Sequence, residues 1–195
     1  MKMSWIKTIA YDQASPRLKK AYDRVKGPEN YIDNVFLVHS LRPNTLKAHW
    51  SLYKNTIHNP KNSLSKWYLE AIGVYVSHLN GCNYCIAHHS AGFLRLYPDS
   101  AEAKQYLEAV KGDATADFFE GKLSLGMDYA RRLTIDMKSI TEDYIQTLRD
   151  GGFSDGELLE LNQVIGYFNY GNRTVLGLGV NTEGDLLYSG PDLAG

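Results

Sequence analysis

Apolar residues recur every three or four positions along most of this chain, which is the spacing of a helix with one buried face. Between residues 44 and 57, for example, Leu46, Trp50, Tyr53 and Ile57 fall on one side of a helix. No later stretch alternates apolar and polar residues convincingly, as a half-buried strand would. The pattern therefore predicts an all-α fold. We expect helices over residues 16–26, inside 31–41, and over 44–57, 65–79, 82–97, 100–110, 117–136 and 141–150, with a last one from about 155.

Residues that favour helix ends mark several of these boundaries. Ser15-Pro16 places a proline at a first helical position, and Ser65 and Thr141 precede two other helices as N-caps. Ser154, followed three residues later by Glu157, has the pattern of a capping box. These signals agree with the boundaries that the apolar pattern gives.

The composition fits one globular domain. A chain of 195 residues, 44% hydrophobic and 22% charged, is long enough to bury a core. We therefore expect a single all-α domain over 1–195, with an N-terminal arm at 1–14 and a C-terminal arm at 182–195. In an oligomer, the C-terminal arm could pack on a neighbouring subunit.

Charge and hydropathy exclude several classes of partner. The formal net charge is −1, which gives no electrostatic reason to expect a nucleic-acid or anionic-membrane partner. No apolar run reaches the length of a membrane helix, and no signal-peptide hydrophobic region follows Met1. Two cysteines spaced C-x-x-C suit a reducing compartment, so we expect a cytoplasmic protein.

A weak internal similarity links the two halves of the chain. Shifted by 89 residues, Ser65 falls on Ser154 and Asn80 falls on Asn169. One interpretation is a bundle built from two related helical hairpins, and the other is coincidence.

The two cysteines belong to a group of four residues with helical spacing. Cys82 and Cys85 lie three residues apart, and His89 follows the second by four. At about 100° per residue, the three side chains fall within roughly 60° of one another on a helix that opens after the turn at residues 80–81. Glu70 lies on the preceding helix, about 15 Å from the bend, while His89 lies about 10 Å beyond it. In a helical hairpin the two can therefore face each other.

This grouping favours reactive thiols. The N-terminal end of a helix and the C-x-x-C spacing both favour the thiolate. His89 is placed to accept or share a thiol proton, with Glu70 as its orienter. One sulfur could then attack an electrophile and the other could close a disulfide. The candidate catalytic residues are Cys82, Cys85, His89 and Glu70.

The four residues resemble the E-x11-C-x-x-C-x-x-x-H signature of the alkylhydroperoxidase D-like enzymes in the carboxymuconolactone decarboxylase superfamily. The segment Val76-Ser-His-Leu-Asn-Gly-Cys-Asn-Tyr-Cys85 resembles the peroxidase-related branch in particular. The resemblance implies an AhpD-like helical bundle that forms homo-oligomers and reduces hydroperoxides without a metal, haem or flavin. An external dithiol or thiol would be its reductant.

The same resemblance implies roles for the four residues. Cys85 would be the attacking thiol, Cys82 the resolving thiol, and His89 and Glu70 a proton relay. One position departs from the pattern, because some members carry a second histidine just before the second cysteine, where this chain has Tyr84.

A second group of polar and aromatic residues lies in the last helix, over residues 167–173. It could line a pocket above the dithiol, or it could be core packing with a kink at Gly171. A similar Asn-Asn-Arg-like pattern occurs in the C-terminal helix of the superfamily. The candidate substrate-binding residues are therefore Tyr84, Tyr167, Asn169, Asn172 and Arg173.

Other interpretations of the cysteines remain open. The two thiolates, His89 and Glu70 could bind zinc, although structural zinc sites usually draw ligands from two separate loops. The cysteines could also be buried and inert, or could form a redox-sensing disulfide in an oligomer. A c-type haem is excluded because Ile86, not histidine, follows Cys85. A thioredoxin fold is excluded because the preceding residues have a helical pattern.

Two further alternatives concern function. A non-redox, decarboxylase-like activity within the superfamily would not need the cysteines. His49 and His58 have no partner at ligand spacing, so we expect them to be ordinary surface or packing histidines.

Overall fold

The computed structural model describes residues 2–27, 30–111, 114 and 118–187, which form helices and loops without any strand among them. The all-α prediction is confirmed. The elements are α1 (Pro16–Val25), α2 (Asn34–Leu37), α3 (Pro43–Thr56), α4 (Lys66–Leu79), α5 (Asn83–Leu96), α6 (Ser100–Lys111), α7 (Gly121–Ile135), the 3-10 turn η3 (Met137–Ser139), α8 (Glu142–Asp150) and α9 (Asp155–Leu178).

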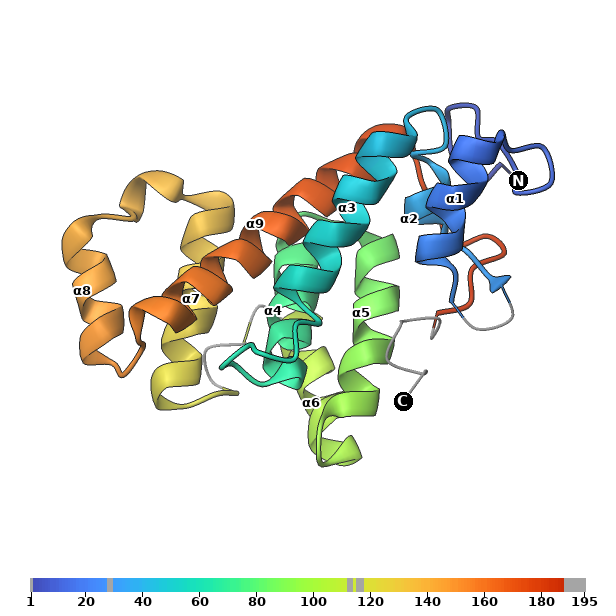
Figure 1. Cartoon of the computed structure of the whole chain (residues 1–195). Helices are drawn as coiled ribbons and strands as arrows, with labels where there is room; N and C mark the ends of the chain where they lie inside the picture. Colours follow the sequence, from blue (N-terminus) through green and yellow to red (C-terminus); the bar gives the residue numbers. More distant parts are fainter. Residues whose placement is uncertain (1, 28–29, 112–113, 115–117, 188–195) are drawn as a thin grey trace.

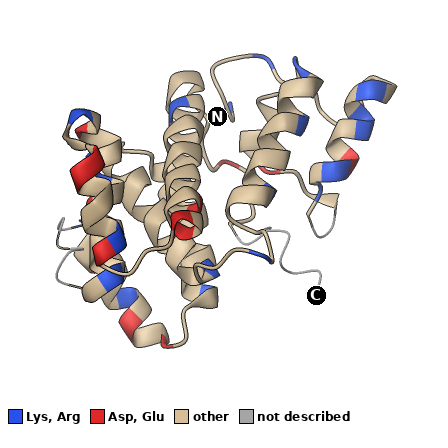
Figure 2. Ribbon diagram, turned by 60° about the vertical axis from the view of Figure 1, so that its left-hand side comes forward, with Lys and Arg blue, Asp and Glu red and all other residues tan. Residues whose placement is uncertain are grey.

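Helix α4 forms the centre of the bundle. Its residues from Tyr68 to Ser77 are all buried, and α5, α6, α7 and α9 pack around it (Figure 1). Its charged residues are Lys66, at the first position, and Glu70, which is buried. Figure 2 shows charged residues of both signs on several other helices and in loops. A carboxylate inside such an apolar helix needs a specific partner.

The predicted caps are mostly present. Ser15 Oγ accepts a hydrogen bond from the backbone N of Leu18 (3.3 Å), and Ser154 and Glu157 form the reciprocal capping box at the start of α9. Thr141 caps α8 in the same way. Ser65 occupies the N-cap position of α4 but makes no capping hydrogen bond with its side chain.

Helix α9 crosses the bundle as one continuous element (Figure 1). A Cβ on Gly73 of α4 would lie 2.1 Å from the ring of Phe168, so glycine permits the two helices to approach closely. No turn interrupts α9 at Gly171, which lies inside the helix. The segment matched to the turn after α4 is therefore helical, and residues 155–178 form one helix rather than a hairpin.

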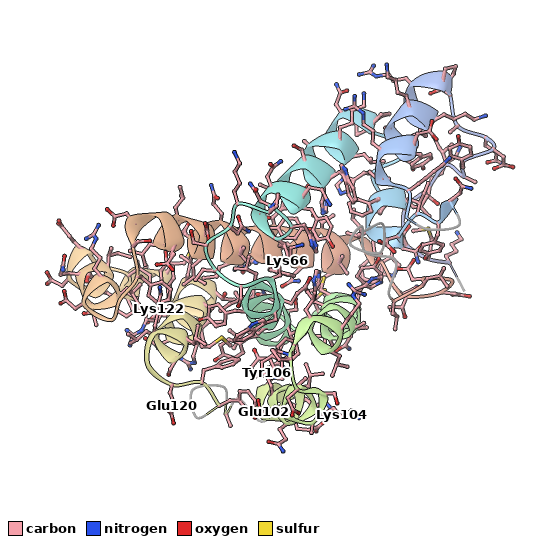
Figure 3. The ribbon with its side chains drawn as sticks, turned by 60° about the horizontal axis from the view of Figure 1, so that its bottom comes forward. Lys66, Glu102, Lys104, Tyr106, Glu120 and Lys122 are labelled. Carbon is pink, nitrogen blue, oxygen red and sulfur yellow. The ribbon has the colours of Figure 1, made fainter. Side chains whose placement is uncertain are left out.

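Helix α6 covers one side of α4 and α5. Figure 3 shows Tyr106 pointing inward from α6, and its hydroxyl donates to the carbonyl of Ala71 on α4 (2.8 Å). The labelled charged residues in the same view, such as Glu102 and Lys104, point outward. Helix α7 begins at Gly121, later than predicted; the expected start at Asp117 lies outside the described residues.

The two ends of the described chain pack on the bundle. Residues 2–14 contain no helix, and the backbone N of Trp5 donates to the carbonyl of Leu178 (2.8 Å). After α9 the chain turns back, and Asn34 Nδ2 donates to the carbonyls of Asn181 (2.9 Å) and Glu183 (3.0 Å). Residues 182–187 thus contact their own chain, while 188–195 of the expected arm lie outside the described residues. None of the described helices has the length and apolar character needed to span a membrane.

Candidate active site

A tight turn joins α4 to α5 and determines where the thiols lie. Gly81 has a φ of +70°, a backbone conformation that glycine adopts without strain. The backbone N of Cys82 donates to the carbonyl of Ser77 (2.8 Å), which closes the end of α4. Cys82 is the N-cap of α5 and Cys85 lies in its first turn. Both sulfurs are therefore at the positive end of the helix dipole.

The turn brings Glu70 of α4 against His89 of α5. His89 Nδ1 and Glu70 Oε2 are 2.7 Å apart, and the side chains are 14% and 3% exposed. His58, in the loop before α4, places its Nε2 4.0 Å from the other carboxylate oxygen. The edge of the His89 ring packs against Phe168 (centroids 4.5 Å apart). The predicted acid and imidazole therefore meet directly, in a water-poor site between three helices.

The two cysteines are reduced and adjacent. Their sulfur atoms are 2.8 Å apart, within hydrogen-bond distance for two thiols. Cys82 is completely buried, whereas Cys85 is 7% exposed. No hydrogen bond joins His89 to either sulfur among the described residues, so a proton moving between them would pass through a water or a substrate.

The contact between the sulfurs shifts the pKa values of the two thiols in opposite directions. The hydrogen bond between them lowers the pKa of Cys82 and raises the pKa of Cys85, while burial opposes charge on both. One thiolate is therefore favoured and a second is disfavoured. Since the remaining proton is shared between the sulfurs, either can carry the charge, and exposure decides which one meets a substrate. That sulfur belongs to Cys85.

An amide from α9 supports the thiolate. Asn172 is completely buried, and its hydrogen bonds to the sulfurs lower the pKa of both cysteines. Its Nδ2 also donates to Ser77 Oγ (3.0 Å), and its Oδ1 accepts from Asn80 Nδ2 (2.9 Å). The network holds the amide in one orientation at the dithiol.

Cys85 opens onto a cavity of about 60 Å³ between α2, α3, α5 and α9. Cys82 is not part of its lining. The ionisable lining residues besides Cys85 and the tyrosines are Asp33, His58, Glu70, His88, His89 and Arg95, and the aromatic ones are Phe36, Tyr53, Tyr84, Tyr167 and Phe168.

The candidate substrate-binding residues fall into two groups. Tyr84, Tyr167 and Asn172 line the cavity beside Cys85. Asn169 and Arg173 lie on another side of α9, where Arg173 donates to Asn169 Oδ1 (2.7 Å), and both border a separate groove of about 370 Å³. The structure therefore brings only the first group to the thiols.

Two histidines at the site were not expected from the sequence. His58 lines the cavity, and His49 is buried with its Nε2 3.1 Å from the hydroxyl of Tyr167. Both are buried packing residues rather than surface residues, and each lies beside a residue of the cavity wall. Each comes from a segment far along the chain from the cysteines, and no spacing rule connects them.

The start of the C-terminal segment forms a polar cluster next to the cavity. Asp33, His88 and Asp185 have ligand atoms within 4.8 Å of one another, the one such His/Cys/Asp/Glu group in the described ranges. Asp185 accepts hydrogen bonds from the Tyr31 hydroxyl and the backbone N of Asn34, and lies 3.1 Å from His88. Its oxygens thus already have protein partners. Cys82, Cys85, His89 and Glu70 do not form a compact ligand set in this conformation.

Comparison with known proteins gives similar folds at low sequence identity. No family model and no curated protein matches the chain. A crystal structure described as an alkylhydroperoxidase AhpD core, from a peroxidase-related protein of Ralstonia eutropha JMP134, is 21% identical, with 98% of this chain and 99% of that chain covered and a TM-score of 0.79. A peroxidase-related protein from Silicibacter sp. TM1040 is 22% identical, with 95% of each chain covered and a TM-score of 0.76.

A third similar structure is an enzyme with a different named activity. A cysteine-to-alanine variant of the debrominase Bmp8, in complex with 2,3,4-tribromopyrrole, is 17% identical, with 93% of this chain and 91% of that chain covered and a TM-score of 0.71. The fold thus occurs in proteins whose activities differ. The expected resemblance holds at the level of architecture: this chain has the all-α fold of the alkylhydroperoxidase D-like, peroxidase-related proteins.

Proposed function

We propose that this chain is a dithiol peroxidase that reduces small hydroperoxides. The observation that carries the proposal is the position of Cys85 Sγ, which lines a buried cavity with Cys82 Sγ 2.8 Å behind it and the Glu70–His89 pair on the same wall. The contact between the sulfurs lowers the pKa of Cys82, and transfer of the Cys85 proton to Cys82 places the thiolate on the sulfur that faces the cavity. The cavity has room for a small electrophile beside Cys85.

The chemistry follows from these positions. The Cys85 thiolate attacks the terminal peroxide oxygen, forming an S–O bond as the O–O bond breaks, and leaves Cys85 as a sulfenic acid and the substrate as an alkoxide that takes one proton. Cys82 Sγ then displaces hydroxide, which leaves as water with the Cys82 proton. Closing the disulfide shortens the sulfur separation by about 0.8 Å. An external dithiol reduces the disulfide by thiol–disulfide exchange.

The Glu70–His89 pair acts as base and orienter. The carboxylate holds the imidazole at its Nδ1, so Nε2 is the nitrogen left to exchange protons in the cavity. It acts through a water or the bound substrate, because it does not contact the sulfurs directly. We also propose that the active protein is a homo-oligomer, which sedimentation equilibrium tests.

Peroxide consumption by two serine variants tests the proposal. With an external dithiol, Cys85→Ser should lose turnover completely. Cys82→Ser should react once, giving a Cys85 sulfenic acid that dimedone traps and mass spectrometry detects. The opposite assignment, with the sulfenic acid on Cys82, or full turnover in Cys85→Ser, contradicts it. Unchanged activity on another substrate in both variants would favour a non-redox enzyme.

Reductive removal of halogen from a small aromatic ring is a second candidate. It is favoured by the aromatic wall of the cavity and by the shared fold of the debrominase bound to 2,3,4-tribromopyrrole. The same dithiol would supply two electrons as it closes to the disulfide; one thiol proton would go to the ring carbon that loses bromine, and bromide would leave with the other. Bromide release from tribromopyrrole, measured beside hydroperoxide consumption, ranks the two activities.

The binding alternatives make other predictions. Stoichiometric zinc in protein purified without added metal, lost in Cys85→Ser, would favour a metal site. A change of oligomer between the reduced and oxidised protein, without turnover, would favour a redox-sensing role.

A further inference from the structure

Three hydrogen-bonded side chains connect the cavity to the surface. The hydroxyl of Tyr167 is 3.1 Å from Nε2 of His49, and Nδ1 of His49 is 2.9 Å from Nε2 of His39. Thr45 Oγ1 lies 3.4 Å from the remaining ring nitrogen of His39. Each ring nitrogen of the two histidines therefore has a polar neighbour, and the series has no gap.

Exposure increases along this series from inside to outside. Tyr167, on α9, lines the cavity and is 7% exposed, and His49, on α3, is 2% exposed. His39, in the loop before α3, is half-buried, and Thr45 is exposed. Four edge-on ring contacts hold His49 in place, with centroid distances of 5.4 Å to Phe36, 4.9 Å to His39, 5.6 Å to Tyr167 and 5.3 Å to Tyr170. The series thus links a buried chamber to solvent through side chains alone.

The central imidazole is neutral at physiological pH. Burial, assisted by the neighbouring His39, lowers the pKa of His49 to about 3. A neutral imidazole has one N–H donor and one bare nitrogen, so it transfers a proton by accepting at one nitrogen while releasing from the other. With His39 donating to His49 and His49 donating to Tyr167, the Tyr167 hydroxyl is left to donate into the cavity.

We propose that Tyr167 is the proton donor to the oxygen that leaves when the peroxide bond breaks, and that His49 and His39 resupply it from solvent. This rests on the function proposed above. When the O–O bond breaks, the alkoxide takes the Tyr167 hydroxyl proton. Tyr167 takes the Nε2 proton of His49, His49 takes the Nε2 proton of His39 at its Nδ1, and His39 takes a proton from solvent.

The proton balance of the full cycle agrees with such a path. One proton enters the cavity when the alkoxide is neutralised. One leaves when reduction of the disulfide restores the thiolate–thiol pair. Transfer of a proton inward to the alkoxide reverses the direction of every hydrogen bond in the series. Transfer of a proton outward, when the disulfide is reduced, restores the original directions. In the proposed function Glu70 and His89 serve the thiols, so the leaving oxygen is assigned to Tyr167.

Two oxidants with different leaving groups test the assignment. The leaving group of tert-butyl hydroperoxide is a strongly basic alkoxide. The leaving group of peracetic acid is acetate, which needs no proton. In Tyr167→Phe, single-turnover oxidation of Cys85 by tert-butyl hydroperoxide should fall about 100-fold, as for loss of a general acid. Oxidation by peracetic acid should fall less than about threefold on the same argument. Tyr144→Phe, the same change on α8 and outside the cavity lining, should leave both rates unchanged.

The outer end of the series provides an independent test. His39→Ala should slow multiple-turnover reduction of tert-butyl hydroperoxide, and added imidazole should restore part of the rate, because the site is half-buried. This result does not depend on whether Tyr167→Phe folds. Equal losses for both oxidants in Tyr167→Phe, or no rescue of His39→Ala, overturn the relay and leave the peroxidase proposal standing. Wild-type protein that reacts with neither oxidant removes both.

Discussion

Glu70 Oε2 lies 2.7 Å from Nδ1 of His89, although nineteen residues and a tight turn separate them in the chain. The carboxylate is buried in the most apolar helix of the bundle, where an unpartnered charge would be costly. Its position is therefore a specific feature of the site, and it allows the role of the carboxylate to be tested separately from the fold.

Replacing Glu70 by glutamine removes the charge and keeps the shape. We expect Glu70→Gln to lower the rate of Cys85 oxidation by about 10–100-fold, because an amide orients the imidazole of His89 without stabilising its protonated form. Stopped-flow measurement under single-turnover conditions checks this. Glu108→Gln, on the exposed face of α6, is the matched control and should react at the wild-type rate.

Gly92 permits the close approach of α5 to this carboxylate. A Cβ at Gly92 would lie 3.0 Å from Glu70 Cδ and 3.1 Å from both of its oxygens. Gly92→Ala should therefore displace the carboxylate from His89 and lower the rate about tenfold, since small misplacements of catalytic groups are costly. Gly166→Ala on α9 meets nothing within 4 Å and should only stabilise the helix, by up to about 1 kcal/mol. Thermal melts and oxidation rates of the two variants separate these effects, and equal rates would contradict the prediction.

The sequence contains enough information for the Glu70–His89 contact because it depends on local geometry. Helical spacing places Cys85 and His89 on one face, and a turn at Gly81 with a positive φ returns α5 along α4. The distance of each residue from that turn then aligns them. Capping at Ser15 and Ser154 is local in the same sense and was predicted correctly.

The rest of the site depends on packing between distant segments. His49 and His58 reach it from α3 and the loop that follows, and Asp185 reaches His88 from beyond α9. Asn169 and Asn172 are three residues apart, yet only Asn172 faces the cavity, because the rotation of α9 is set by Phe168 packing on Gly73. No pattern within one segment reports such contacts.

The thiol pair should titrate in two separated steps. The hydrogen bond between the sulfurs lowers the pKa of Cys82, so one thiolate should form at a lower pH than in an ordinary cysteine, and the second only at a higher pH. Absorbance at 240 nm, which reports thiolate, measures both steps. Cys85→Ala removes the hydrogen bond and leaves the opposing effect of burial, so it should move the first step to higher pH. A shift to lower pH in this variant would contradict the hydrogen bond between the sulfurs.

The buried His49 should make the fold sensitive to mild acid. Its pKa is about 3 in the folded protein, against an ordinary value of 6.5, because burial disfavours the charged ring. Below pH 6.5 the unfolded chain therefore takes up a proton that the folded protein does not, so stability is lost as the pH falls towards 3 and is fully present above 6.5. At pH 5 the loss is about 2 kcal/mol.

His49→Gln keeps a polar group beside Tyr167 but does not titrate. Between pH 7 and pH 5, the free energy of unfolding in urea should therefore fall by about 2 kcal/mol less in His49→Gln than in the wild type. Between pH 7 and pH 8, where His49 is neutral in both states, the two proteins should respond alike, and parallel losses below pH 6.5 would show that His49 is not buried as a neutral ring.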